Sequence, residues 1–203
     1  MSGSFFGSPE FKDKGVYLID FYRVAFNRLP HYPEFSVDLA SITGATAAEA
    51  NARRAAFAAN FVQRPEFTNT YGAMTNSAYV NALMNGGLGQ GYNLTSIVTP
   101  DPLNPDGPTK ITLTTNDLIN GLNTSTLTKA QVLRAIVQSD QISLALEVVN
   151  AFVASQYYGY LRREPDAGGF NGWVTYLKNN PNDFRTMVHG FVDSTEYRSR
   201  FGP

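Results

Sequence analysis

The side chains best suited to binding chemistry gather around one Arg-x-Pro-Asp turn in the last third of the chain. The faces of Trp and Tyr can stack on sugar rings, and Arg and Asp side chains can hydrogen-bond sugar hydroxyls. The sequence therefore offers a candidate ligand-binding surface made of Tyr158, Tyr160, Arg163, Asp166, Trp173 and Tyr176. The competing interpretation, which the sequence favours, is that the aromatic residues join two helices and lie in the core.

Residues typical of catalysis are few and scattered. The two histidines, His31 in a turn and His189 in a helix, are far apart in the sequence, and cysteine is absent. Neither a Gly-x-Ser-x-Gly elbow nor a His-Glu-x-x-His motif occurs. We therefore expect no enzymatic activity, no catalytic residue, no metal site and no cofactor.

Two loops share part of a ligand-binding motif but lack its essential residues. The glycine-rich stretch Gly86–Gly91 has neither the P-loop lysine nor a preceding strand. The stretch Asp101–Gly107 lacks the alternating oxygen donors of a calcium loop, and Thr112 stands where the closing Glu would be. We expect a flexible turn at the first loop and a proline-braced turn at the second.

Charge and composition exclude several classes of protein. The 203 residues carry 16 basic and 17 acidic side chains, and 43% of them are hydrophobic. A net charge near zero is not a nucleic-acid-binding footprint, and this apolar content is too high for a disordered chain. No apolar run approaches the roughly 18 residues that span a bilayer, and the first residues lack the pattern of a signal peptide. We expect no nucleic-acid partner and no membrane span.

One seven-residue motif recurs along the chain. Its copies are Phe5-Phe-Gly-Ser-Pro-Glu-Phe11, Phe61-Val-Gln-Arg-Pro-Glu-Phe67, Phe191-Val-Asp-Ser-Thr-Glu-Tyr197 and a degenerate Ile136-Val-Gln-Ser-Asp-Gln-Ile142. The middle interval is longer than the others because of an insertion dense in proline and other turn residues. We expect a Pro-rich loop or a small hairpin near residues 93–113.

A second motif repeats in register with the first. Tyr22-Arg-Val-Ala-Phe-Asn-Arg-Leu-Pro-His31 aligns with Tyr157-Tyr-Gly-Tyr-Leu-Arg-Arg-Glu-Pro-Asp166, whereas the middle copy, from Tyr79, loses its Arg-x-Pro. The two motifs divide the chain into the tail of a preceding unit (1–15), a helical unit (16–75), an expanded unit (76–147) and a final unit (148–203). We expect these units to pack as one or two globular domains cut from a larger protein.

The motifs contain helix-start signals. Ser8, Thr46, Thr128 and Asp166 are predicted N-caps, and apolar residues follow them at helical spacing. The same spacing from Ile142 to Arg162 predicts one long helix. The sequence thus predicts an all-α fold, a helical bundle of about three degenerate repeat units.

The final unit resembles a bacterial family known as domain of unknown function 4214. The resemblance is carried by Tyr157-x-x-Tyr-Leu-x-Arg-x-Pro-Asp-x-x-Gly-Phe-x-x-Trp173 followed by Phe191 and Ser194-x-Glu-Tyr197. It is close over 148–203, fair over 16–75 and poor over 76–147. Phycobilisome linker domains show a more distant likeness.

The resemblance implies a helical module of a secreted or surface protein, with no assigned activity. We therefore expect a non-catalytic interaction, spacer or anchoring module whose partners are other domains of the same polypeptide or surface proteins. An extracellular or cell-surface location follows from the resemblance alone. The alternative is a carbohydrate-binding module that recognises glycans through the Tyr/Trp cluster.

Overall fold

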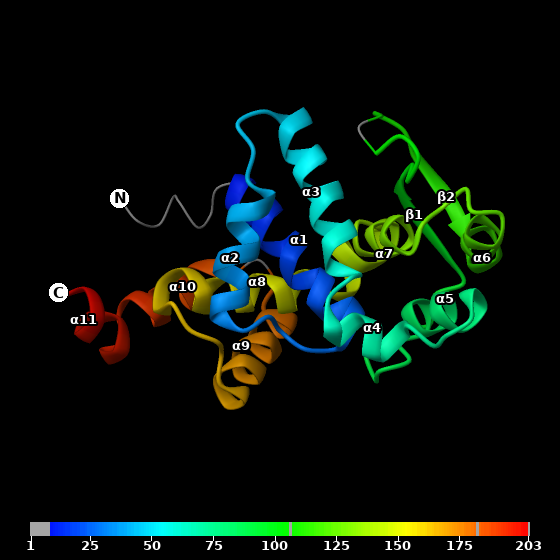
Figure 1. Ribbon diagram of the computed structural model, residues 1–203. Coiled ribbons are helices and arrows are strands. Elements are labelled where there is room, and N and C mark those ends of the chain that lie inside the picture. Colours follow the sequence, from blue (N-terminus) through cyan, green and yellow to red (C-terminus); the bar gives the residue numbers. More distant parts are fainter. Residues whose placement is uncertain (1–8, 106, 182, 203) are drawn as a thin grey trace.

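The computed structural model describes residues 9–105, 107–181 and 183–202, without the side chains of residues 9–13. This part of the chain is helical apart from one two-stranded sheet, which confirms the predicted all-α class (Figure 1). The elements are α1 (Pro9–Phe26), α2 (Tyr32–Ile42), α3 (Ala47–Phe61), α4 (Pro65–Tyr71), α5 (Asn76–Met84), β1 (Ser96–Pro100), β2 (Lys110–Thr114), α6 (Thr115–Asn123), α7 (Lys129–Val137), the π-helix η1 (Gln141–Leu146), α8 (Val148–Gln156), the π-helix η2 (Tyr157–Leu161), α9 (Ala167–Asn179), α10 (Phe184–Val192) and α11 (Thr195–Phe201).

The insertion in the middle unit forms the predicted hairpin. Strands β1 and β2 pair antiparallel with Ser96 opposite Thr114 and Pro100 opposite Lys110. Helix α6 begins directly after β2, because Thr114 accepts a hydrogen bond from the Asp117 N–H while the Asp117 carboxylate accepts one from the Thr114 N–H. The hairpin and α6 therefore form one compact addition to the helical core (Figure 1).

Local capping explains where most helices start. The side chains of Thr46, Thr128, Asp166 and Ser194 each accept a hydrogen bond from the third backbone N–H of the helix that follows. At α3 the carboxylate of Glu49 accepts from the Ala45 N–H rather than from the N-cap residue itself. The predicted cap at Ser8 lies outside the described residues.

The prediction of one long helix from Ile142 to Arg162 is wrong. The π-helix η1 ends at Leu146, α8 begins at Val148, and η2 ends at Leu161, directly before Arg162, whose φ of 49° is left-handed. A π-turn admits an extra residue and so rotates the face that the next helix buries. Leu146 is consequently exposed while Glu147 is buried, the reverse of the predicted pattern.

Helix α1 is the centre of the core. Leu18, Ile19, Phe21 and Val24 are completely buried, and α1 packs against α2, α7 and α8. Figure 1 shows α1 and α8 crossing near the middle of the molecule. A second cluster of apolar residues lies within the last unit, between α8, η2, α9 and α10. Tyr158 of η2 belongs to the first cluster, so the last unit shares the core of the first.

Candidate functional site

Two of the six predicted binding residues lie in the core. Tyr158 and Tyr160 are each only 2% exposed. The Tyr158 hydroxyl donates to the Pro30 carbonyl at 2.6 Å, and its ring stacks on Phe35 with centroids 4.4 Å apart. The ring of Tyr160 packs beside Phe191 in the second cluster. Neither ring offers a free face to a ligand.

Arg163 and Asp166 hold the turn together. Asp166 caps α9 by accepting from the Gly169 N–H at 2.8 Å, which lowers the pKa of its carboxyl. Arg163 donates from Nε and Nη2 to the two carboxylate oxygens of Glu196 at 2.7 and 2.8 Å. Its guanidinium also lies 5.2 Å from the centroid of the Tyr157 ring. These contacts are intramolecular and join the turn to α11.

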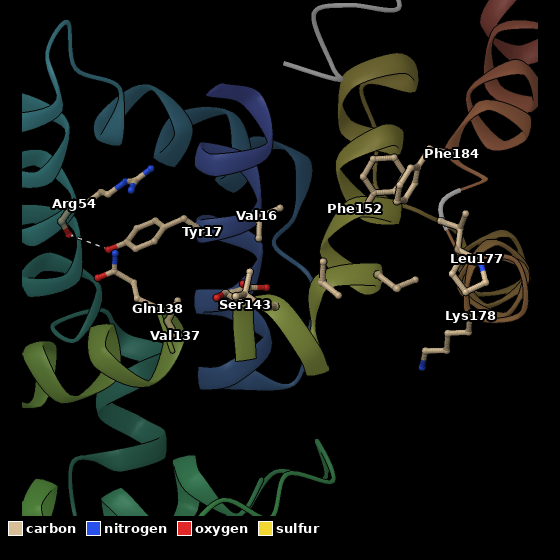
Figure 2. Close-up of a pocket in the computed structure, with 15 residues that line it drawn as sticks. Val16, Tyr17, Arg54, Val137, Gln138, Ser143, Phe152, Leu177, Lys178 and Phe184 are labelled. Atoms are coloured by element: carbon tan, nitrogen blue, oxygen red, sulfur yellow. Dashed lines mark hydrogen bonds between the residues drawn. The ribbon is translucent and has the colours of Figure 1, made fainter. Parts of the chain in front are cut away.

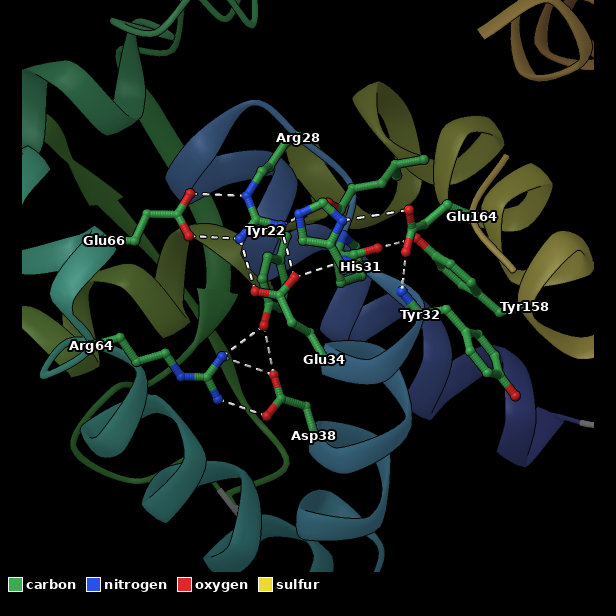
Figure 3. A network of polar contacts seen from close by, with 12 residues as sticks. Tyr22, Arg28, His31, Tyr32, Glu34, Asp38, Arg64, Glu66, Tyr158 and Glu164 are labelled. Atoms are coloured by element: carbon green, nitrogen blue, oxygen red, sulfur yellow. Dashed lines mark hydrogen bonds and ion pairs between the residues drawn. The ribbon is translucent and has the colours of Figure 1, made fainter. Parts of the chain in front are cut away.

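The same arrangement occurs in the first unit. Arg28 donates from Nε and Nη2 to Glu66 at 2.9 and 2.6 Å and lies 4.9 Å from the centroid of the Tyr22 ring (Figure 3). In each unit the Arg of the Arg-x-Pro turn thus pairs in bidentate fashion with the Glu of the seven-residue motif. We call this pair of interactions, Arg28–Glu66 and Arg163–Glu196, the Arg–Glu clamp.

The middle unit has lost both halves of the clamp. Its Arg-x-Pro is replaced by Asn85-Gly-Gly, and Gln141 stands where the other units have Glu. The Gln141 side chain instead accepts a hydrogen bond from the Val98 N–H at 2.9 Å, on the inserted hairpin. A buried or half-buried carboxylate without its guanidinium would be unfavourable, so the two changes compensate each other.

Replacing Glu196 by glutamine is expected to destabilise the chain by about 1 kcal/mol, because a bidentate, half-buried Arg–carboxylate pair is lost. Hydrogen bonds from Arg163 lower the pKa of Glu196, so the contribution is present above the ordinary Glu pKa and is lost as pH falls through the lowered value. Urea unfolding at neutral and at acidic pH measures both effects. The matched control is Asp193→Asn, which removes an exposed pair with Arg198; equal losses for the two variants would contradict the prediction.

Trp173 and Tyr176 are partly exposed on α9 but are also engaged with neighbours. The indole stacks on Phe191 with centroids 6.1 Å apart and meets the Tyr176 ring edge-on at 5.7 Å. The Tyr176 hydroxyl donates to Asp183 at 2.5 Å. Trp173 and Arg163 line a cavity of about 170 Å³, which is smaller than the sites that hold drug-sized ligands. The six predicted residues therefore do not meet on one exposed surface.

The two histidines lie on the surface, each near a carboxylate. His31 Nδ1 is 3.5 Å from Glu164, whose carboxylate also accepts from the Tyr32 N–H at 2.6 Å (Figure 3). His189 Nδ1 is 3.9 Å from Asp193. These contacts are exposed and lie in different parts of the fold, so the histidines do not form a joint site. Among the described residues no group of three or more acidic or histidine side chains is arranged to hold a metal ion.

One pocket is lined by residues of α1, η1 and α8 and by residues at the end of α9 and the start of α10. It has a volume of about 660 Å³ and is lined by Val16, Tyr17, Asp20, Arg54, Val137, Gln138, Ser143, Leu144, Val148, Val149, Phe152, Leu177, Lys178, Pro181 and Phe184. Figure 2 shows Tyr17, Arg54 and Gln138 on one side of it and Phe152, Leu177 and Phe184 on the other. Most of the lining is apolar, and the volume lies in the range of small-molecule sites. We call this cavity the α1–α8 pocket.

One buried carboxyl group belongs to the wall of the pocket. Asp20 is 1% exposed, and within the described part of the chain neither of its oxygens has a hydrogen-bond partner. Burial, and the nearby negative charge of Glu147, raise the pKa of Asp20 well above its usual range, although Arg23 opposes this shift. Buried polar groups are almost always hydrogen-bonded, so this carboxyl group is exceptional.

Glu147, by contrast, is fully paired. Its carboxylate accepts from Arg23 Nε at 3.1 Å and Nη2 at 3.3 Å, from the Tyr92 hydroxyl at 2.6 Å and from Asn150 at 2.8 Å. Burial and the Glu147 charge raise the pKa of Tyr92. The guanidinium of Arg23 therefore serves Glu147 through direct contacts and Asp20 only through its charge.

Neither Asp20 nor Glu147 is among the binding-site residues that the sequence predicts. A usable signal exists for Asp20, because the segment from Val16 to Ala25 is apolar on every face, and a helix of that kind is buried all round. An acid in such a helix must also be buried. Glu147 has no comparable signal, since its burial depends on the π-turn that precedes it.

Fold and pocket define an all-α helical protein with a sizeable, mostly apolar cavity. Residues 145–201 match the family model described as Domain of unknown function (DUF4214), which confirms the resemblance predicted for the last unit. No curated protein and no solved structure matches the chain. In the described residues, no helix combines the length and the apolar character needed to cross a bilayer.

Proposed function

We propose that this chain is a non-catalytic binding module of a larger polypeptide and that the α1–α8 pocket is its binding site. The observation that carries the proposal is the pocket itself: about 660 Å³, mostly apolar, and edged by the exposed side chains Leu144, Val148 and Phe184. Exposed apolar residues grouped around a cavity are typical of a site that a ligand covers.

The polar groups of the pocket support binding rather than catalysis. The Ser143 hydroxyl donates to the Ser139 carbonyl at 2.9 Å and is not paired with a base. The Arg54 guanidinium lies 4.9 Å from the centroid of the Tyr17 ring, and the Arg54 carbonyl accepts from the Tyr17 hydroxyl. Neither histidine lines the pocket, and the Ser143 hydroxyl is hydrogen-bonded to a backbone carbonyl rather than to a base.

The carbohydrate-binding alternative rests on Trp173, which with Tyr176 is partly exposed among the aromatic residues of the predicted surface. One face of its indole is covered by Phe191, which leaves less area for stacking on a sugar. A glycan array with the native chain and with Trp173→Ala tests this alternative: binding that the variant loses would favour it over the pocket. An extracellular location remains a proposal that the family resemblance alone supports.

Nile red, a neutral apolar dye, is expected to bind the native chain at one site with a blue-shifted emission, because the α1–α8 pocket excludes water. Leu144→Glu should weaken this binding about fivefold to tenfold, since a charged group replaces an apolar edge. Fluorescence titration gives both dissociation constants.

The matched control is Val37→Glu, because Val37 is 70% exposed and Leu144 is 65% exposed, and both lie on helical segments. Val37 does not line the pocket. Dye binding that is absent in the native chain, or that both substitutions weaken equally, would contradict the proposed site.

A further inference from the structure

Asp20 gives the α1–α8 pocket a buried carboxyl group that a hydrogen-bond donor on a ligand could pair. Its two oxygens have no hydrogen-bond partner in the described residues, yet the side chain lines the cavity. An unpaired carboxyl group at such a position is available to a ligand that can donate hydrogen bonds. An apolar ligand alone would leave it unpaired.

The charges around Asp20 favour a cation. Asp20 and Glu147 are both buried, and Arg23 is the cation nearest to them; its Nε and Nη2 are already hydrogen-bonded to Glu147. The pocket also contains Arg54 and Lys178. Arg54 lies over Tyr17 and has interactions of its own, and Lys178 is exposed on α9. When Asp20 is ionised, the group formed by Asp20, Glu147 and Arg23 carries one negative charge that is not balanced.

We propose that the α1–α8 pocket binds a small amphiphilic amine, with the alkyl or aryl part against Val16, Val149 and Phe152 and the ammonium group hydrogen-bonded to Asp20. The proposal rests on the pocket being the binding site, and it names the class of ligand. A primary ammonium combines the missing positive charge with three N–H donors. An alcohol of the same shape supplies a hydrogen bond without the charge.

Release of the Asp20 proton is a second measurable consequence of binding an amine. In the empty pocket the Asp20 carboxyl keeps its proton, because burial and Glu147 disfavour the charged form. When an ammonium group arrives, Asp20 ionises, its proton passes to the buffer, and the ammonium keeps all of its own protons. Binding therefore releases up to one proton, and affinity rises by up to about tenfold per pH unit until Asp20 is ionised in the free protein. The other titratable groups near Asp20 or the pocket are Glu147, Tyr17, Tyr92, Arg23, Arg54 and Lys178.

The test compares octylamine with octanol, which has nearly the same shape and no charge. Isothermal titration calorimetry with the native chain should give about 10- to 100-fold tighter binding for octylamine. Repeating the titration in phosphate and in Tris should change the observed heat by the difference in buffer ionisation enthalpy, multiplied by the released proton.

Asp20→Asn is the decisive variant. It should bind octylamine about 10- to 100-fold more weakly and octanol within twofold of the native chain. It should also unfold at a higher temperature at neutral pH, because a carboxyl group that stays protonated only in the folded state favours unfolding as pH rises. Asp193→Asn, an exposed substitution directly after α10, is the control and should change none of these values.

The possible outcomes distinguish a wrong ligand class from a wrong binding site. Equal affinities for octylamine and octanol, or an Asp20→Asn variant that binds octylamine as well as the native chain does, would overturn the amine while leaving Nile red binding in place. Absence of any binding heat with octylamine would also overturn the proposal of an amine ligand. Absence of binding by octylamine, octanol and Nile red together overturns the pocket as a site.

Discussion

Replacing Arg23 by glutamine is expected to lower the free energy of unfolding by roughly 3–5 kcal/mol, because it breaks a buried ion pair by removing one partner. Arg23 is mostly buried, and Glu147 almost completely so. Without the guanidinium, Glu147 loses two hydrogen bonds, and two carboxyl groups lie near each other with no cation between them. Urea unfolding followed by circular dichroism measures the loss.

The loss of unfolding free energy caused by Arg23→Gln should depend on pH in a defined direction. Burial and the charge of Glu147 raise the pKa of Asp20, and Arg23 opposes this shift, so removal of the cation raises the pKa of Asp20 further. The folded chain then holds more protons than the unfolded chain above pH ~4. Stability therefore falls as pH increases above that value, and the variant should be relatively more stable at pH 5 than at pH 8.

Two controls isolate the electrostatic part of the effect. The double variant Arg23→Gln, Glu147→Gln should recover part of the loss, since it removes the unbalanced charge together with the cation. Arg53→Gln removes an exposed pair with Glu49 and should cost less than about 0.5 kcal/mol. A loss for Arg23→Gln no larger than that for Arg53→Gln would contradict the account of the cluster.

Replacing Phe61 by alanine is expected to cost roughly 3–5 kcal/mol, because it opens a cavity in the aromatic centre of the first unit. Phe61 is completely buried. Its ring centroid lies 5.3, 5.2 and 5.3 Å from those of Phe21, Tyr22 and Phe26. These rings lie on α1 and α3, so their contact joins the two helices.

Phe201→Ala is the matched control for the aromatic centre. Phe201 is exposed at the end of α11, where its ring lies beside Tyr197 and Arg162. Its replacement should cost less than about 1 kcal/mol. Thermal unfolding of both variants decides the question, and comparable shifts in Tm would show that Phe61 does not hold the core.

For the aromatic side chains of the predicted binding surface, residue spacing predicts the helices but not which rings are exposed. The spacing around Tyr157, Phe170 and Trp173 correctly indicates two helices joined by a capped turn. The same spacing cannot tell which ring faces water, because a helix carries side chains on every face and its neighbours decide which face they cover. Tyr158 is buried against Phe35, a residue 123 positions earlier in the chain (158 − 35).

The repeated motifs also separate what the sequence predicts from what only the fold shows. The sequence identifies the Arg-x-Pro turn and the seven-residue motif as separate repeating elements. Only the fold shows that Arg28 meets Glu66 and that Arg163 meets Glu196, which explains why the middle unit lacks both partners. The clamp joins residues 38 and 33 positions apart, beyond the range of any local periodicity.

By itself the sequence determined the all-α class, the capped helix starts, a Pro-rich loop or small hairpin near residues 93–113 and the family resemblance of the last unit. These features depend on hydrogen bonds and side-chain spacing within a few residues, so they can be read locally. Tertiary structure alone decided the break at Glu147, the burial of Tyr158 and the α1–α8 pocket that contains Asp20. Each of these depends on segments from opposite ends of the chain meeting in space, and desolvation and charge balance at such contacts are properties of the assembled core.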